Sequence, residues 1–285
     1  MTAATLAVPV TRTATSAPLG RLLRSELAWV FKRPRTWIAL TLLALVPIVI
    51  AIGTRVGGGR PDGGGGSLIA DLLGNGFVLP IVALTVTLTL LLPLVGAMWS
   101  ADAIAGEASN STLRYLLVAP VGRVRLLVVK SFGVATAVLA ATVLIAVVGV
   151  IAGYLVFGSH DLLTLSGTTL SFGAAIARVA IATIWVAAQV WAVCAVALAM
   201  STLTDHPMVV MAATLAGAVV FGVLGSIPAL SWLQPYLLTT SWQSLTDVLR
   251  DPMPAGGLLH GLAVAGCYAV IGWSLAVARM VTKDG

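Results

Sequence analysis

The stretch WSADAIAGEASNSTLRYLLVAPVGRVRLLVVK, residues 99–130, decides how this chain is organised. It is a polar interruption between two long apolar segments, and it ends in alternating apolar and basic positions. The Ser-Asn-Ser run at 109–111 is favourable for capping, because these side chains accept hydrogen bonds from free backbone amides at a helix start. Pro120 then holds the residue before it out of the helical conformation. We therefore expect a short helix from about Ser111 to Val118, lying at the membrane surface.

The composition excludes a soluble globular protein. Of the 285 residues, 59% are hydrophobic and only 9% are charged, whereas soluble domains carry about 25% charged residues. The chain is thus predicted to be an all-α polytopic membrane protein. Cys194 and Cys267 lie inside apolar runs and are interpreted as packing residues. His160, His206 and His260 show no metal-ligand spacing, so no metal site is expected.

Six apolar segments have about the length needed to cross a bilayer. They cover about residues 37–54, 77–99, 126–157, 172–202, 208–224 and 257–277. Residues 1–17 are expected to form a disordered cytoplasmic tail, and residues 18–285 a single transmembrane domain. Gly149 and Gly153 form a GxxxG pair that permits close contact between helices. The segment TTSWQSLTDVLRD, residues 239–251, is predicted to be a capped amphipathic helix.

The distribution of basic residues predicts the orientation. Most of the 16 Lys and Arg residues precede the first span, lie between the second and third, or follow the last. Those on the other side are Arg55, Arg60, Arg178 and Arg250. Because cytoplasmic loops are enriched in Lys and Arg, we expect both termini in the cytoplasm. The segment 226–255 then faces outward and is expected to act as an outer lid.

Residues 19–32 show apolar positions at helical spacing with basic residues opposite, a pattern typical of a helix lying in the membrane interface. Glu26 falls on the apolar face, and two interpretations stay open. It forms an ion pair with a nearby arginine, or it contacts the polar stretch around Glu107.

For Arg178, Trp185 and Gln189, which lie in the fourth span, a structural and a functional interpretation both stay open. Arg178 snorkels outward or pairs with Asp161, which is favoured, or it attracts an acidic group of a substrate. Gln189 makes an interhelical hydrogen bond, which is favoured, or contacts a ligand. Trp185 packs in the interior or lines an aromatic path.

No motif for an energy source is present. The chain has no GxxxxGK[ST] phosphate loop and no HExxH or GxSxG sequence. Its acidic residues are confined to loops and span ends, unlike the buried acids of ion-coupled transporters. We therefore expect no catalysis by this chain and a motor on another polypeptide. The basic residues adjoin apolar segments, which indicates membrane topology rather than nucleic-acid binding.

Four segments resemble the ABC-2-type permeases, the membrane subunits of ATP-binding-cassette exporters. They are RSELAWVFKRPRTW at 24–37, IAGE at 104–107, STLRYLLVAPVGRVRLLVVK at 111–130 and RMVTKDG at 279–285. The resemblance implies an N-terminal connecting helix that contains Arg24, Glu26 and Trp29. It also implies a cytoplasmic coupling helix that docks on a separate ATPase. The coupling residues would be Glu107, Ser111, Thr112, Leu113, Arg114, Leu116 and Pro120.

The resemblance further implies two permease bodies, identical or different, and two ATPase subunits in a bacterial plasma membrane. ATP and Mg would be bound by the ATPase subunits, with no cofactor on this chain. The predicted function is outward movement of an amphipathic or hydrophobic substrate, with Arg178, Trp185 and Gln189 as candidate residues of its path. Two alternatives stay open: an ion-coupled secondary transporter, or a permease of a lipid, polysaccharide or metalloenzyme-maturation pathway.

Overall fold

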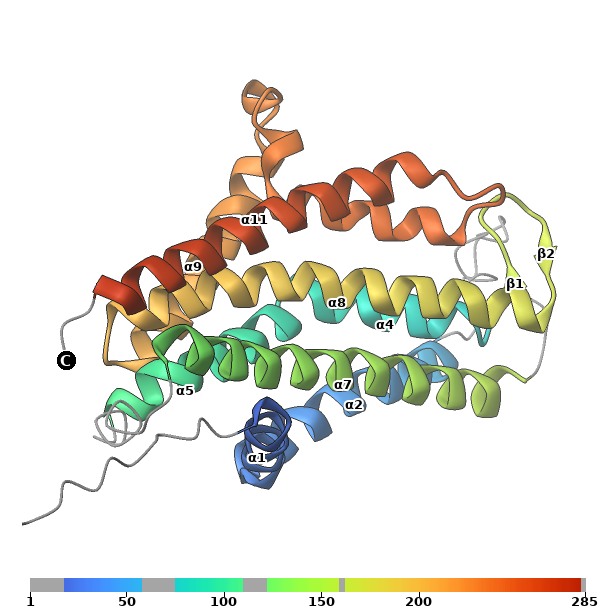
Figure 1. Ribbon diagram of the computed structural model, residues 1–285. Helices are drawn as coiled ribbons and strands as arrows, with labels where there is room; N and C mark the ends of the chain where they lie inside the picture. The colour runs from blue at the N-terminus through green and yellow to red at the C-terminus, as the bar shows by residue number, and fades with distance from the viewer. Residues whose placement is uncertain (1–17, 58–74, 110–121, 159–161, 283–285) are drawn as a thin grey trace, which may run out of the picture.

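The computed structural model describes residues 18–57, 75–109, 122–158 and 162–282, which are almost entirely helical (Figure 1). The long helices are α2 (Pro34–Gly57), α7 (Arg123–Phe157), α8 (Phe172–Leu203), α9 (Pro207–Ser226) and α11 (Ala255–Thr282). The shorter α-helices are α1 (Leu19–Lys32), α4 (Val78–Thr89), α5 (Leu91–Ser109) and α10 (Leu238–Ser241). The 3-10 helices are η1 (Pro228–Leu230), η2 (Gln234–Tyr236) and η3 (Trp242–Leu249). Two short strands, β1 (Leu162–Leu163) and β2 (Thr169–Leu170), pair antiparallel.

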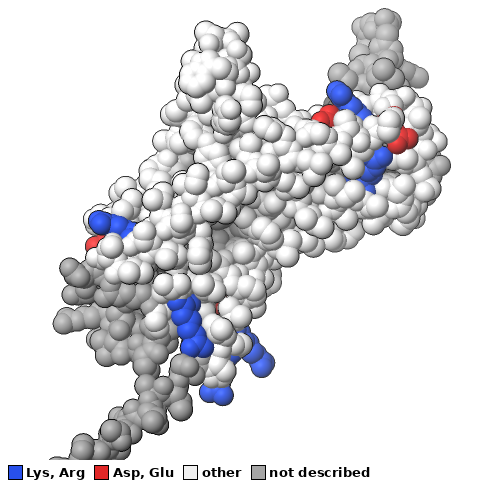
Figure 2. All heavy atoms as spheres, turned by 45° about the horizontal axis from the view of Figure 1, so that its top comes forward, with Lys and Arg blue, Asp and Glu red and all other residues white. Residues whose placement is uncertain are grey.

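The described helices confirm an all-α polytopic membrane protein. Five of them, α2, α7, α8, α9 and α11, are long and apolar enough to cross a bilayer, and α4 with α5 makes a sixth span if the bent pair is counted as one. Figure 2 shows Lys, Arg, Asp and Glu at the two ends of the visible face, with an uncharged surface between them. That uncharged surface is what contact with lipid hydrocarbon requires, because a charged side chain is costly there.

The second span is not the single helix expected over residues 77–99. It bends by 55° between α4 and α5, where Leu90 leaves the helical conformation with φ −144° and ψ −52°. Pro93 explains the break, because proline has no amide hydrogen for the carbonyl of Thr89 and its ring crowds that group. Helical bonding resumes when the Leu94 amide donates to the Leu90 carbonyl at 3.0 Å.

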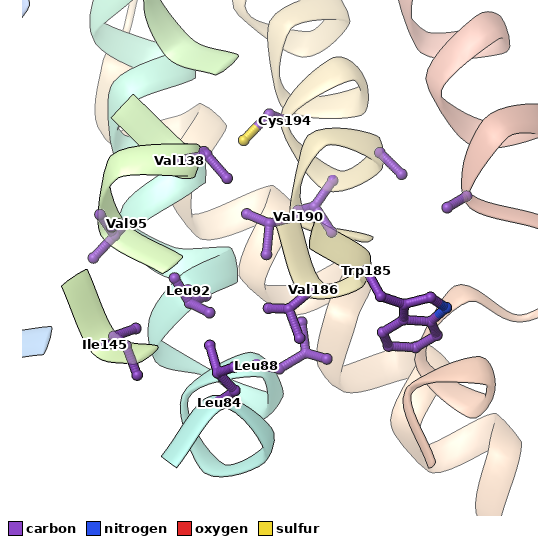
Figure 3. Packing of buried hydrophobic residues seen from close by; sticks show 14 of the residues in the cluster. Leu84, Leu88, Leu92, Val95, Val138, Ile145, Trp185, Val186, Val190 and Cys194 are labelled. Carbon is purple, nitrogen blue, oxygen red and sulfur yellow. The ribbon is translucent and has the colours of Figure 1, made fainter. Parts of the chain in front are cut away.

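α8 lies at the centre of the bundle and packs against α4, α5, α7, α9 and α11. Figure 3 shows its side chains Val186 and Val190 among apolar residues of α4, α5 and α7. The α5–α8 contact is especially close: a Cβ added at Gly96 would lie 2.7 Å from the sulfur of Cys194. Cys194 is therefore a buried packing residue with a free thiol.

The predicted GxxxG pair lies at a close contact between α7 and the start of α4. A Cβ added at Gly149 would lie 2.7 Å from Cα of Pro80, and one added at Gly153 would overlap the carbonyl oxygen of Gly76. Only glycine allows two backbones to approach this closely. The α4 half of the second span therefore rests directly on the third.

The prediction of a capped amphipathic α-helix over residues 239–251 is wrong. The segment is one α-helical turn, α10, followed by the 3-10 helix η3, and neither has a side-chain cap. The apolar residues Trp242, Leu245 and Val248 are buried and recur every third position. That spacing places them on one face of a helix with three residues per turn, which accounts for the 3-10 form.

Candidate functional site

One end of the bundle holds a compact group of ion pairs, here called the inner cluster: Glu26, Arg33, Arg35, Asp102, Glu107 and Lys130. These residues come from α1, the α1–α2 junction, the C-terminal half of α5 and the first turns of α7. In Figure 1, α1 is seen nearly end-on, while α7, α8 and α11 run across the picture. α1 thus lies across the bundle and contacts both α2 and α7.

Lys130 of α7 joins α1 to α5. Its Nζ lies 3.1 Å from Oε2 of Glu26 and 3.4 Å from Oε1 of Glu107. The Lys130 side chain is only 6% exposed, and those of the two carboxylates are 10% and 12% exposed. One cation therefore neutralises two carboxylates in a largely water-free environment, where the loss of any one partner is costly.

Arg33 ties the junction of α1 and α2 to α5. Its guanidinium lies 3.1 Å from Oδ2 of Asp102 and 3.2 Å from the ring centroid of Trp29. A second cation, Nζ of Lys130, lies 4.2 Å from the same centroid. Trp29 thus contacts both cations by cation–π interactions. Arg35 contributes less, because it is 3.8 Å from Asp102 and mostly exposed.

The packing around Glu26 buries its carboxylate, and this burial shifts its pKa. A Cβ added at Gly133, one turn beyond Lys130 on α7, would lie 2.9 Å from Cγ of Glu26. Glycine at this position therefore makes room for the Glu26 side chain. Burial raises the pKa of Glu26 above its ordinary value of 4.5, and the attraction of Lys130 opposes that rise. Burial likewise lowers the pKa of Arg33, with Asp102 opposing the change.

The structure places the predicted connecting residues as follows. Glu26 pairs with a lysine of the stretch that contains Glu107, rather than with a nearby arginine. Trp29 lies between two cations, and Arg24 is exposed. Glu107 belongs to the inner cluster. The other predicted coupling residues lie outside the described residues: Ser111, Thr112, Leu113, Arg114, Leu116 and Pro120.

The sequence interpretation missed the structural importance of Lys130, Asp102 and Arg33, which it treated as topology signals or boundary charges. A signal was present: Lys130 and Gly133 are three residues apart and so share a helix face, which leaves space beside the lysine for a partner.

The inner cluster adjoins residues 110–121 on both sides, through Glu107 before them and Lys130 after them.

The three candidate residues of a substrate path lie on α8 and are engaged by other parts of the chain. Arg178 pairs with Asp251 at 3.2 Å and donates to the carbonyls of Val248 and Arg250. The predicted partner Asp161 lies outside the described residues.

Trp185 and Gln189, deeper in α8, both bond to the backbone of α11. Trp185 Nε1 donates to the Leu258 carbonyl at 2.9 Å, and Gln189 Nε2 donates to the Gly261 carbonyl at 3.0 Å. Gln189 is fully buried and also accepts from Ser241. These contacts hold α8 to α11, and a role in a substrate path stays a prediction.

At the opposite end of the bundle, Arg178 and Asp251 form part of a second polar group, here called the outer clasp. It consists of Ser166, Thr168, Arg178 and Asp251 with the backbone around Leu165 and Leu249. Thr168 donates to Asp251 at 3.2 Å, and the Asp251 amide donates to Ser166 at 3.1 Å. The outer clasp joins the β1–β2 hairpin to the connection between η3 and α11.

Comparison with known proteins agrees with a bundle of apolar membrane-spanning helices. A search among curated proteins finds no match. The family model described as "ABC-2 family transporter protein" matches residues 22–204, which is more than half of the chain and includes every residue of the inner cluster. The chain therefore belongs to the ABC-2 family of transporter membrane proteins.

Proposed function

We propose that this chain is the permease subunit of an exporter driven by ATP that a separate subunit hydrolyses. Membership of the ABC-2 family implies a non-catalytic transmembrane subunit and an ABC ATPase partner. ATP and Mg would be bound by that partner. Two ATPase subunits and a second permease body complete the proposed transporter, in a bacterial plasma membrane with both termini of this chain in the cytoplasm.

The observation that carries this proposal is the bridge made by Lys130. Residues 110–121 connect α5 to α7, and Lys130 binds both Glu107 of α5 and Glu26 of α1. A force applied to residues 110–121 would therefore act on α5, α7 and α1 together. The ion pairs make these helix ends one mechanical unit, which is what a motor outside the membrane needs in order to move the spans.

The proposed substrate is amphipathic or hydrophobic and moves outward. Motion of the inner cluster would change the angle between two permease bodies, and the segment 226–255 would act as the outer lid. The 42 exposed large hydrophobic side chains of the described residues leave apolar surface on which lipid or a second permease body could pack.

The proposal is tested by purifying the tagged full-length chain with its ATPase, identified by a Walker A sequence, and measuring ATP hydrolysis in liposomes. We expect the double variant Glu107→Gln, Leu113→Ala to lose most of the stimulation of hydrolysis and to retain less ATPase on purification. The matched control is Asp247→Asn at the other end of the bundle, where Asp247 pairs with Arg250 at 3.7 Å.

Normal coupling in the double variant would contradict the proposal. So would substrate movement by the purified chain alone in liposomes without nucleotide, because a secondary transporter driven by an ion gradient would behave in that way. The double variant must still insert into the membrane, which fractionation checks directly.

A further inference from the structure

A recess lies where the break in the second span faces α9 and the α10–η3 segment. One cavity, of about 310 Å³, is lined by residues of α4, the break, α9 and η3, including Thr85, Thr89 and Gly222. A second cavity, of about 160 Å³, extends between α8, α9 and α11 and includes Gly217. Both are lined by Ala218, Thr239 and Trp242, so these side chains form the wall between the two cavities.

Hydrogen-bond donors in this wall have no protein acceptor. Trp242 is only 7% exposed, and its Nε1 has no partner within the described part of the chain; the same holds for Oγ1 of Thr239. A buried donor without an acceptor destabilises the folded state, and such groups in native proteins call for an explanation. The Nε1 atom itself is occluded, so the indole would have to turn to present its N–H to a molecule in either cavity.

Gln243, which is exposed, also lines the larger cavity and has a side-chain amide that can donate, whereas the other polar side chains of the recess outside the wall already donate their hydrogens within the protein. The hydroxyls of Thr85 and Thr89 donate to the carbonyls of Ile81 and Val86 in their own helix, at 2.8 and 2.7 Å. Among the described residues, no Asp, Glu, Lys or Arg lines either cavity. An ionic head group would therefore enter the recess without a counter-charge, which is costly in an apolar environment.

From these observations we propose that the recess binds an uncharged amphipathic molecule, an apolar chain carrying an ester or similar acceptor that Trp242 Nε1–H holds. The larger cavity has the volume of a small-molecule site. Glycines keep the recess open: an added Cβ at Gly217 or Gly222 would meet no atom within 4 Å. This inference concerns binding by the chain itself and does not depend on coupling to an ATPase.

The test measures equilibrium binding of radiolabelled 1-monooleoylglycerol to the purified full-length chain in nanodiscs, with oleate as the charged comparison. Gly222→Leu places a side chain in the larger cavity without a backbone clash and should weaken binding by about tenfold or more. Gly266→Leu on α11 is the matched control, because that glycine also meets no atom within 4 Å but lines neither cavity. Its affinity should equal that of the wild type.

Trp242→Phe tests the hydrogen bond, since it keeps the ring and removes the N–H. Binding of the ester should weaken roughly threefold to tenfold, and binding of octadecane, which has no acceptor, should not change. Equal binding by wild type and Gly222→Leu, or binding of oleate as tight as that of the ester, would overturn the proposal.

A second measurement identifies the source of the ligand. If a neutral bilayer lipid co-purifies with the wild type and Gly266→Leu but not with Gly222→Leu, the recess is a lipid site. If no lipid differs while the ester still binds in the recess, the ligand is supplied from outside the bilayer lipids. A photoreactive monoacylglycerol that labels only peptides outside α4, α9 and residues 238–243 would contradict both readings.

Discussion

The inner cluster and the outer clasp both join distant segments of the chain, but they do so with different chemistry. At the inner end, Lys130 holds two carboxylates that are largely hidden from water. At the outer end, Arg178 bonds two backbone carbonyls in addition to Asp251, and Asp251 is 34% exposed. The inner connection depends on charge balance, and the outer one depends more on the path of the backbone.

This difference suits the two ends to different tasks. Ion pairs among side chains can exchange partners when helix ends move, because three cations and three carboxylates lie within one group. Hydrogen bonds to main-chain carbonyls fix a loop in one place. We therefore expect the inner end to respond strongly to loss of a charge and the outer end to respond through local opening.

The largest effect is expected at Lys130. Lys130→Met leaves the carboxylates of Glu26 and Glu107 without their shared cation, which should lower the free energy of unfolding by about 3–5 kcal/mol. Chemical unfolding of the purified chain in detergent measures this loss. The triple variant that also carries Glu26→Gln and Glu107→Gln should recover part of it, even if Lys130→Met alone does not fold. A loss under about 1 kcal/mol in the single variant would refute the importance of the bridge.

A smaller effect is expected at Arg178. Arg178→Met removes the partner of Asp251 and the donors to the carbonyls of Val248 and Arg250. Because Asp251 and the Arg250 carbonyl are partly exposed, water can replace the guanidinium in part, so the loss should be about 1–2 kcal/mol. The change should be local, with faster hydrogen exchange at the Leu165 amide, which donates to the Leu249 carbonyl at 2.9 Å. Arg55→Met is the control, since Arg55 is exposed and bonds one carbonyl. Unchanged exchange in Arg178→Met would remove the distinction between the two ends.

The smallest effect is a pH dependence. Burial raises the pKa of Glu26 in the folded chain, so the folded state binds the Glu26 proton more tightly than the unfolded state does. The contribution of this group to stability therefore falls as the pH rises from about 4.5 through the folded pKa. Glu26→Gln should remove this part of the pH slope, as measured by unfolding between pH 4 and pH 8. An identical slope in both proteins would be the contrary result.

The sequence predicted the spans well because their apolar runs are long, but it did not predict the break at Leu90. Pro47 lies within the continuous helix α2, whereas Pro93 follows a break. The same residue type therefore has two outcomes, and packing around it decides which occurs. The partner of Glu26 was also left open, because it depends on the rotation of α7, a helix about a hundred residues further along the chain.

The glycine contact between the second and third spans has a mechanical consequence. Gly149 and Gly153 hold the beginning of α4 against α7 with almost no gap between their backbones, while Leu90 interrupts the helix that continues as α5. The second span thus consists of α4, which is held against α7, and α5, which continues at an angle beyond the bend. Because the bend at Leu90 separates the two helices, α5 can change its angle while α4 keeps its backbone contact with α7.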